Sequence, residues 1–149
     1  MDTLILVCPS CGQLNRAPAD RLQAREVPQC GGCQRSLFDG HPVEVTSATS
    51  FDRMVARNQI PVVVDFWAAW CGPCRAMSPQ FETAARQAEP LVRFLKVDTE
   101  ALPDVAGRFS IRSIPTMILF RDGREIARKA GAMDVRAILA WIAGENASS

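Results

Sequence analysis

The sequence lacks an excess of charge of either sign, and it lacks any long apolar run. Its 149 residues include 17 basic and 16 acidic residues, which leave a formal net charge of +1. This balance gives no support for an electrostatic surface that binds nucleic acid or a charged membrane. No apolar run approaches the roughly 20 residues that a membrane-spanning helix needs. We therefore expect no nucleic-acid partner and no membrane segment.

The N-terminus also lacks the pattern of a secretory signal, and the chain lacks a glycine-rich nucleotide-binding motif. Only the apolar residues 4–7 precede the first cysteine, whereas a signal needs a basic start and an apolar stretch of about 7–15 residues. We therefore expect a cytoplasmic, reducing location, where cysteine pairs indicate metal binding or catalysis rather than a disulfide framework. Without a nucleotide site, redox chemistry would need an external electron donor.

Six cysteines are present, and they form three Cys-x-x-Cys pairs. Cys8/Cys11 and Cys30/Cys33 are separated by 18 residues between the inner cysteines, which fits the spacing of zinc sites with two such pairs. Four thiolates complete a closed tetrahedral shell with no position for water, so this spacing predicts one structural zinc ion. The alternatives are two structural disulfides or four unrelated thiols.

The chain is expected to divide into a zinc-binding module at residues 1–40 and a larger domain at residues 41–149. A segment of about 40 residues with few large apolar side chains folds poorly without a metal. The boundary is predicted from the turn-rich stretch 38–42. Leu37 and Phe38 either dock the module on the larger domain or belong to the module's own small core.

Apolar patterning in the larger domain predicts strands that alternate with helices, an α/β class. Strands are expected at 43–45, 62–67, 91–97, 116–120 and 125–130, with a hairpin turn at Asp122-Gly123. Ser50 and Asp134 are expected to cap helices, and Pro79 to kink the long helix that contains it. This order predicts a mixed sheet flanked by helices, with parallel strands on either side of each crossover helix and an antiparallel edge from the hairpin.

The third pair, Cys71 and Cys74, follows an apolar run that ends at Trp67 and precedes a helical pattern that includes Met77. The pair is therefore predicted to lie where a strand ends and a helix begins. The positive end of a helix dipole and its unpaired N–H groups favour the thiolate, which is the nucleophilic form. We interpret the pair as a redox dithiol. A third zinc knuckle would need two further ligands, and no cysteine remains to supply them.

The stretch Val64–Arg75, with the sequence VDFWAAWCGPCR, resembles the active-site region of thioredoxins, and Ile114-Pro115-Thr116 and Gly131 follow in the family's order. The resemblance covers residues 43–145. With the four-cysteine extension, the whole chain resembles the zinc-binding thioredoxin-2 type of bacterial thioredoxins. This implies the thioredoxin fold with a zinc-ribbon-like module, reduction of disulfides in client proteins, and electron transport from an NADPH-dependent thioredoxin reductase. We also expect a monomer.

Catalytic roles follow from the resemblance and the chemistry of the pair. Cys71 is expected to attack a client disulfide and Cys74 to resolve the mixed disulfide. Asp65 lies within an apolar run, where burial raises the pKa of a carboxyl, and the resemblance implies that it accepts the proton of Cys74. Lys96 occupies the place of a family lysine near that carboxyl. The alternatives are an Asp65 bonded to backbone and a solvated Lys96.

Pro115 matches the family's cis-proline opposite the dithiol, and the free backbone groups before it can pair with an extended substrate strand. An apolar docking surface is expected from Trp70, Gly72, Pro73, Ile114, Gly131 and Ala132; for Trp70 the alternative is core packing.

A second functional hypothesis concerns the N-terminal module. It makes the module a redox sensor that releases zinc on oxidation, or part of a redox-regulated chaperone that binds partners. An oxidase or isomerase role is disfavoured by Gly72-Pro73 and by the missing signal.

Overall fold

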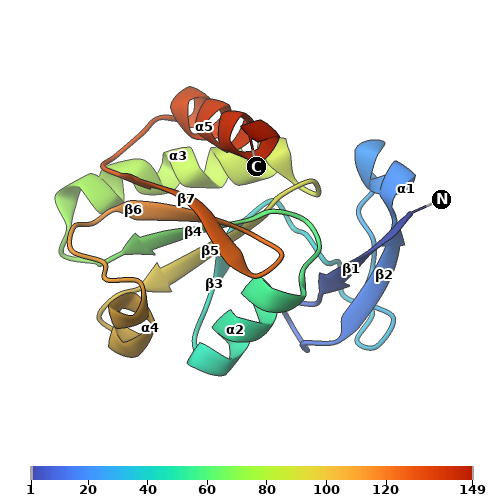
Figure 1. The fold of residues 1–149 in the computed structure, drawn as a ribbon. Coiled ribbons are helices and arrows are strands. Elements are labelled where there is room, and N and C mark those ends of the chain that lie inside the picture. Colours follow the sequence, from blue (N-terminus) through green and yellow to red (C-terminus); the bar gives the residue numbers. More distant parts are fainter. Residues whose placement is uncertain (1, 149) are drawn as a thin grey trace.

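A five-stranded sheet forms the centre of the larger domain in the computed structural model, which describes residues 2–148 (Figure 1). Its strand order is β3-β5-β4-β6-β7, and the strands span Val43–Glu44 (β3), Val62–Trp67 (β4), Arg93–Asp98 (β5), Thr116–Arg121 (β6) and Arg124–Ala130 (β7). β5 runs parallel to β3 and β4, whereas β6 is antiparallel to β4 and β7. The predicted mixed sheet is confirmed.

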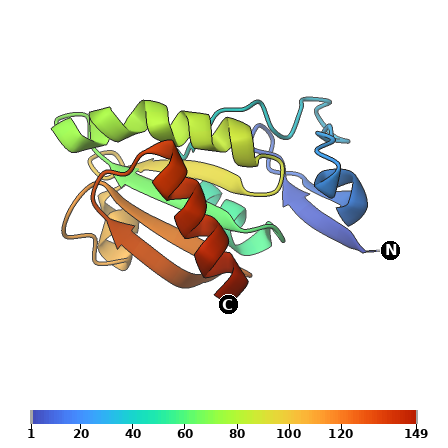
Figure 2. The ribbon, with the colours of Figure 1, turned by 90° about the horizontal axis from the view of Figure 1, so that it is seen from above.

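Helices cover both faces of this sheet (Figures 1 and 2), and they span Ala48–Arg57 (α2), Gly72–Ala88 (α3), Pro103–Arg108 (α4) and Val135–Ser148 (α5). Side chains alternate along β4, so Val62, Val64 and Phe66 pack toward α2 and α4, while Val63 packs toward α3 and α5. By the same alternation Asp65 lies on the α3 face. Within residues 2–148, no helix has the length and hydrophobicity needed to cross a bilayer.

The direction of β6 departs from the parallel arrangement expected for strands joined through a helix. α4 has six residues, a rise of about 9 Å, whereas α3 has 17 residues and rises about 25 Å. The longer helix carries the chain back along a whole strand, but α4 is too short to do so. The chain therefore enters β6 at the end of the sheet where it left β5, and β6 runs antiparallel to its neighbour β4.

The helix starts and turns agree with the sequence pattern except at α2. Its N-cap is Ser47, whose hydroxyl accepts the N–H of Ser50 at 3.0 Å, so the predicted Ser50 cap is wrong by three residues. Asp134 accepts the N–H of Ala137 at 2.9 Å and caps α5 as predicted. Pro79 lies inside α3, and the helix continues beyond it to Ala88.

The N-terminal module contains a hairpin and a short helix that the sequence pattern did not reveal. β1 (Thr3–Val7) pairs antiparallel with β2 (Leu14–Pro18), and α1 (Ala19–Gln23) follows. Each element has only five residues, which is too short for a clear periodicity. The apolar residues of β1 are the same ones whose run is too short for a signal segment.

Leu37 and Phe38 join the module to the larger domain. Both are buried in a cluster that also contains Ile60 of the larger domain. The two residues therefore belong to the core of the module and at the same time dock it on the larger domain. Arg93 of β5 is 1% exposed; its guanidinium lies 4.0 Å from the centroid of the Phe38 ring and donates a hydrogen bond to the Leu37 carbonyl. Glu89 pairs with this buried guanidinium at 4.0 Å.

We expect Phe38→Ala to lower the free energy of unfolding by about 3 kcal/mol, because it opens a cavity in the shared core and removes the ring against which the Arg93 guanidinium lies. The measurement is chemical denaturation followed by tryptophan fluorescence, since all three tryptophans lie in the larger domain. Phe38→Leu keeps much of the buried apolar area and is the control, with a smaller expected loss. Unchanged stability of Phe38→Ala would show that the two parts share no core.

Candidate active site

The dithiol lies at the first turn of α3, directly after the sheet. Cys71 is the N-cap of the helix, and Gly72 and Pro73 separate it from Cys74. The two sulfurs form a disulfide, so the structure represents the oxidised state. The N–H of Cys74 points to Cys71 Sγ at 3.2 Å. After reduction, this N–H and the helix dipole stabilise a thiolate on Cys71.

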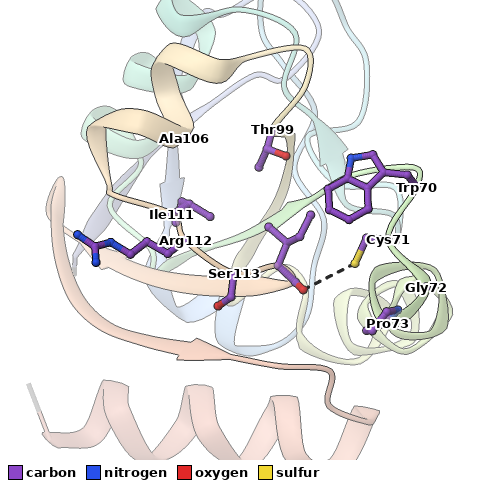
Figure 3. Close-up of a pocket in the computed structure, with 10 residues that line it drawn as sticks. Trp70, Cys71, Gly72, Pro73, Thr99, Ala106, Ile111, Arg112 and Ser113 are labelled. Atoms are coloured by element: carbon purple, nitrogen blue, oxygen red, sulfur yellow. Dashed lines mark hydrogen bonds between the residues drawn. The ribbon is translucent and has the colours of Figure 1, made fainter.

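A pocket of about 500 Å³ opens beside Cys71 (Figure 3). Both cysteines are buried, with 4% of Cys71 and 2% of Cys74 exposed, but Cys71 lines this pocket and Cys74 does not. Trp70 forms part of the wall; it is 67% exposed, so the alternative of core packing is wrong for this side chain. Its indole N–H donates to Glu100 at 3.0 Å, which holds the ring at the pocket. Of the two cysteines, Cys71 is thus the one that borders the open pocket.

The segment around Pro115 faces the dithiol. The Ile114–Pro115 peptide bond is cis, and the Ile114 carbonyl oxygen lies 3.7 Å from Cys71 Sγ, marked by the dashed line in Figure 3. The N–H of Gly131 donates to the Pro115 carbonyl at 2.9 Å. Gly131 and the adjacent Ala132 are exposed and lie outside the pocket beside Trp70. The expected docking residues thus lie partly in the pocket and partly beside Pro115.

Sequence reasoning missed several lining residues of this pocket, namely Thr99, Ala106, Ile111, Arg112 and Ser113. A signal existed for two groups of them. Residues 111–113 directly precede Ile114-Pro115 in the chain. Thr99 directly follows β5, and because β4 and β5 are parallel, their carboxyl ends meet at the edge of the sheet where the dithiol lies.

Asp65 is buried on the α3 face of the sheet, with 1% of its surface exposed. Neither carboxyl oxygen has a hydrogen-bond partner within residues 2–148, so the alternative of an Asp65 bonded to backbone is wrong. Burial raises the pKa of Asp65 to about 7, while the charge of Lys96 lowers it and that of Glu44 raises it. A carboxyl that titrates near neutral pH is suited to accept a proton.

Lys96 is the β5 partner of Asp65 in the sheet. Its half-buried ammonium does not pair with the carboxyl: Nζ donates to Ser78 Oγ at 3.3 Å and lies 4.6 Å from the centroid of the Trp67 ring. The alternative of a freely solvated Lys96 is therefore wrong. Its charge still acts on Asp65 through space.

The four N-terminal cysteines gather in the loops of the module. Their sulfurs all lie within 4.8 Å of one another, with 3.7 Å between Cys8 and Cys33 and 3.6 Å between Cys11 and Cys30. Bonds of 2.3 Å from a tetrahedral zinc ion to four sulfurs require sulfur–sulfur edges of about 3.8 Å. The donor set therefore fits a four-coordinate metal ion. All four are free thiols, so structural disulfides and unrelated thiols do not describe this cluster.

Donors around the sulfurs support a thiolate cluster. The N–H of Ser10 points to Cys8 Sγ at 3.4 Å, and the N–H of Gly32 points to Cys30 Sγ at 3.4 Å. The side-chain amide of Asn15 adds a donor to Cys30 at 3.6 Å. Such donors offset the negative charge of metal-bound thiolates and orient the ligands.

Comparison with known proteins identifies both parts of the chain. The family model described as Thioredoxin matches residues 42–144. The chain belongs to the thioredoxin family. A second model, the zinc ribbon described as Thioredoxin 2, N-terminal, matches residues 7–35, a range that contains all four clustered cysteines. The larger domain therefore has the thioredoxin fold.

Similar proteins include thioredoxins over most of the chain. Thioredoxin C-3 of Corynebacterium nephridii is 40% identical over 139 residues, 93% of each chain. A solved structure of a mutant thioredoxin from Halobacterium salinarum has a TM-score of 0.65 and 30% identity, and covers 72% of this chain and 93% of that one. A bifunctional thioredoxin reductase/thioredoxin of Mycobacterium leprae is 41% identical over 100 residues, 67% of this chain and 22% of that protein. As a thioredoxin, the protein is a protein disulfide oxidoreductase that reduces protein disulfides.

Proposed function

We propose that Cys71 is the attacking thiolate and Cys74 the resolving thiol of this disulfide reduction. The Cys71 thiolate attacks one sulfur of a client disulfide, forms a mixed disulfide and displaces the other client sulfur as a thiolate. Cys74 then attacks the Cys71 sulfur, which forms the Cys71–Cys74 disulfide and releases the second client sulfur. The observation that carries this assignment is that Cys71 caps α3 and lines the open pocket, while Cys74 does not line it.

Asp65 is the proposed acceptor of the Cys74 proton, through a water molecule. Burial of the carboxyl without a hydrogen-bond partner supports this role, because it raises the pKa of Asp65 to about 7. The raised pKa lets the carboxyl take up a proton near neutral pH and release it after the disulfide has formed. Lys96 has the proposed role of moderating this carboxyl by its charge.

The proposed docking site receives an extended client segment at Ile114 and Pro115. Pro115 has no N–H to offer, so pairing uses the backbone of Ile114, whose carbonyl lies 3.7 Å from Cys71 Sγ. Apolar contacts come from the exposed Trp70 and from neighbours on both sides of Pro115, which are Gly72, Pro73, Gly131 and Ala132. Trp70, Gly72 and Pro73 line the pocket with Cys71, and Gly131 is hydrogen-bonded to the Pro115 carbonyl, which supports their proposed role.

The proposed cofactor is one structural zinc ion held by Cys8, Cys11, Cys30 and Cys33. Sulfur is a preferred ligand of zinc, and a shell of four sulfurs leaves no open position for catalysis. We assign residues 1–40 to this module and residues 41–149 to the thioredoxin domain; the two matched ranges, 7–35 and 42–144, support a boundary between them. The proposed location is the cytoplasm, where such thiols stay reduced.

The proposed electron donor is an NADPH-dependent thioredoxin reductase, and a relative that joins both activities in one chain supports it. The test combines the full chain, insulin, NADPH and such a reductase, and follows NADPH oxidation together with insulin precipitation. Both are expected to depend on the chain. If the chain reduces insulin only after chemical reduction, the donor is wrong; if it does not reduce insulin even then, the proposed chemistry is wrong.

Asp65→Asn is expected to change activity and stability in opposite directions. It removes the proton acceptor, so insulin reduction at pH 7 should fall at least about tenfold. Between the ordinary pKa of 3.8 and the raised pKa of about 7, the folded state keeps a proton that the unfolded state loses. Stability of the parent chain therefore falls as pH rises through this range, by about 4 kcal/mol at 1.36 kcal/mol per pH unit.

The variant lacks this loss, so it should unfold at higher denaturant than the parent at pH 8, with the difference shrinking toward zero at pH 4. Denaturation at the two pH values provides the measurement and its internal control. A pH-independent difference would contradict the raised pKa of Asp65.

A further inference from the structure

A row of charged side chains crosses the sheet beneath α3. Glu44 on β3 pairs with Lys96 on β5, and Lys96 pairs with Asp65 on β4, so all three lie on one face in neighbouring strands. β3 is the edge of the sheet. Exposure decreases along the row, from the exposed Glu44 through the half-buried Lys96 to the buried Asp65. Lys96 thus stands between two acidic residues of unequal exposure in neighbouring strands.

The Lys96 side chain is held by groups other than Asp65. Its Nζ donates to Ser78 Oγ on α3 at 3.3 Å and lies over the Trp67 ring. Ser78 is one helical turn after Cys74, so this contact holds the ammonium beside the catalytic helix. Asp65 has no hydrogen-bond partner among the described residues, although the charge of its strand neighbour acts on it.

We propose that Ser78 and Glu44 are positioning residues that hold the Lys96 ammonium away from the Asp65 carboxyl, so that this carboxyl remains able to accept a proton. The inference rests on the proposed role of Asp65. It adds Ser78 and Glu44, which lie outside the stretch 64–75, to the residues that support this role. A direct ion pair with Lys96 would lower the pKa of Asp65 and leave a stably ionised, weak base. Ser78 competes with Asp65 for the Lys96 ammonium through a hydrogen bond. Glu44 competes with Asp65 through the attraction of its negative charge for the same ammonium.

After burial itself, the charged groups that act on the ionisation of Asp65 are Lys96 and, more weakly, Glu44. From α3 the facing groups are Cys71 and Cys74, which are joined in the disulfide. From β6 the strand partner is the uncharged Met117, and the next residue along this row, Lys129 on β7, is exposed. On β5, Asp98 acts on Glu44 rather than on Asp65.

The test is a carboxyl ¹³C NMR titration of Asp65 in the oxidised full chain, where no thiol of the dithiol titrates. Ser78→Ala should lower the titration midpoint of Asp65 by about one pH unit, because the freed ammonium moves to the carboxyl. Glu44→Gln should lower it by about half a unit, because a negative charge two strands away is lost. Glu26→Gln removes the same charge at an exposed site in the module and should leave the midpoint unchanged.

A double-mutant comparison separates positioning from a general structural effect. In a Lys96→Met background, Ser78→Ala should no longer shift the Asp65 midpoint, because no ammonium remains to be released. A shift that persists in this background, or a midpoint unchanged by both Ser78→Ala and Glu44→Gln, would overturn the proposal. The titration needs no enzymatic activity. A negative result would therefore contradict the positioning proposal alone, whereas the insulin assay and the activity of Asp65→Asn test the proposed function.

Discussion

Cys71→Ser is expected to reduce insulin-disulfide reduction to the uncatalysed background, a loss on the order of 10³-fold or more, because a serine hydroxyl is not ionised at neutral pH and cannot form a disulfide. Two features support the proposed role of this sulfur. It alone of the pair lines the open pocket, and the Cys74 N–H at 3.2 Å and the start of α3 stabilise its negative charge. The reductase-coupled insulin assay measures the loss.

Cys74→Ser is the matched control, since it removes a sulfur from the same turn of the same helix. This variant keeps the attacking thiolate but cannot resolve the intermediate. It should therefore accumulate a mixed disulfide with insulin, visible by mass spectrometry under non-reducing conditions, and stop after one turnover. A stable mixed disulfide formed by Cys71→Ser, with none formed by Cys74→Ser, would show that the two roles are reversed.

The position of this dithiol was predictable because its signals are local. The change from a strand pattern to a helical pattern occurs within a few residues of Cys71, and this change locates the helix N-terminus that activates the thiol. Burial of Asp65 follows in the same way from the apolar neighbours on its strand. Both features can be read from the residue types and the apolar periodicity of one continuous stretch of sequence.

The features that the sequence did not predict depend on contacts between distant segments. The direction of β6 depends on how far α4 carries the chain. Arg112 lines the pocket because of the path of the loop between α4 and β6. The ammonium of Lys96 is held by Ser78, 18 residues earlier in the chain. No periodic pattern links these residues, so only the packing of α3 on the sheet reveals their contact.

Removal of the metal ion is expected to unfold the N-terminal module while the sheet of the larger domain stays folded. The module has few large buried side chains, chiefly Leu6, Leu22, Leu37 and Phe38. Binding of a structural zinc ion contributes on the order of 10 kcal/mol to folding in small zinc domains. Without the ion, the four cysteines lose the bonds that join them and the loops lose their anchor. Hydrogen exchange should then show loss of protection in β1 and β2, with β4 and β5 still protected.

Metal content and thiol reactivity test the same assignment in the reduced chain. We expect one zinc ion per chain and two freely reactive thiols, Cys71 and Cys74, with six reactive thiols after chelation. Cys30→Ser, at a fully buried ligand position, should lose the ion and the protection of the module. The double variant Cys71→Ser/Cys74→Ser should retain one zinc ion and leave no freely reactive thiol. The two Cys-x-x-Cys pairs of the module form one sulfur cluster, so a bound ion would shield all four thiols together. Six reactive thiols in a module whose amides are still fully protected from exchange would rule out a metal-held fold.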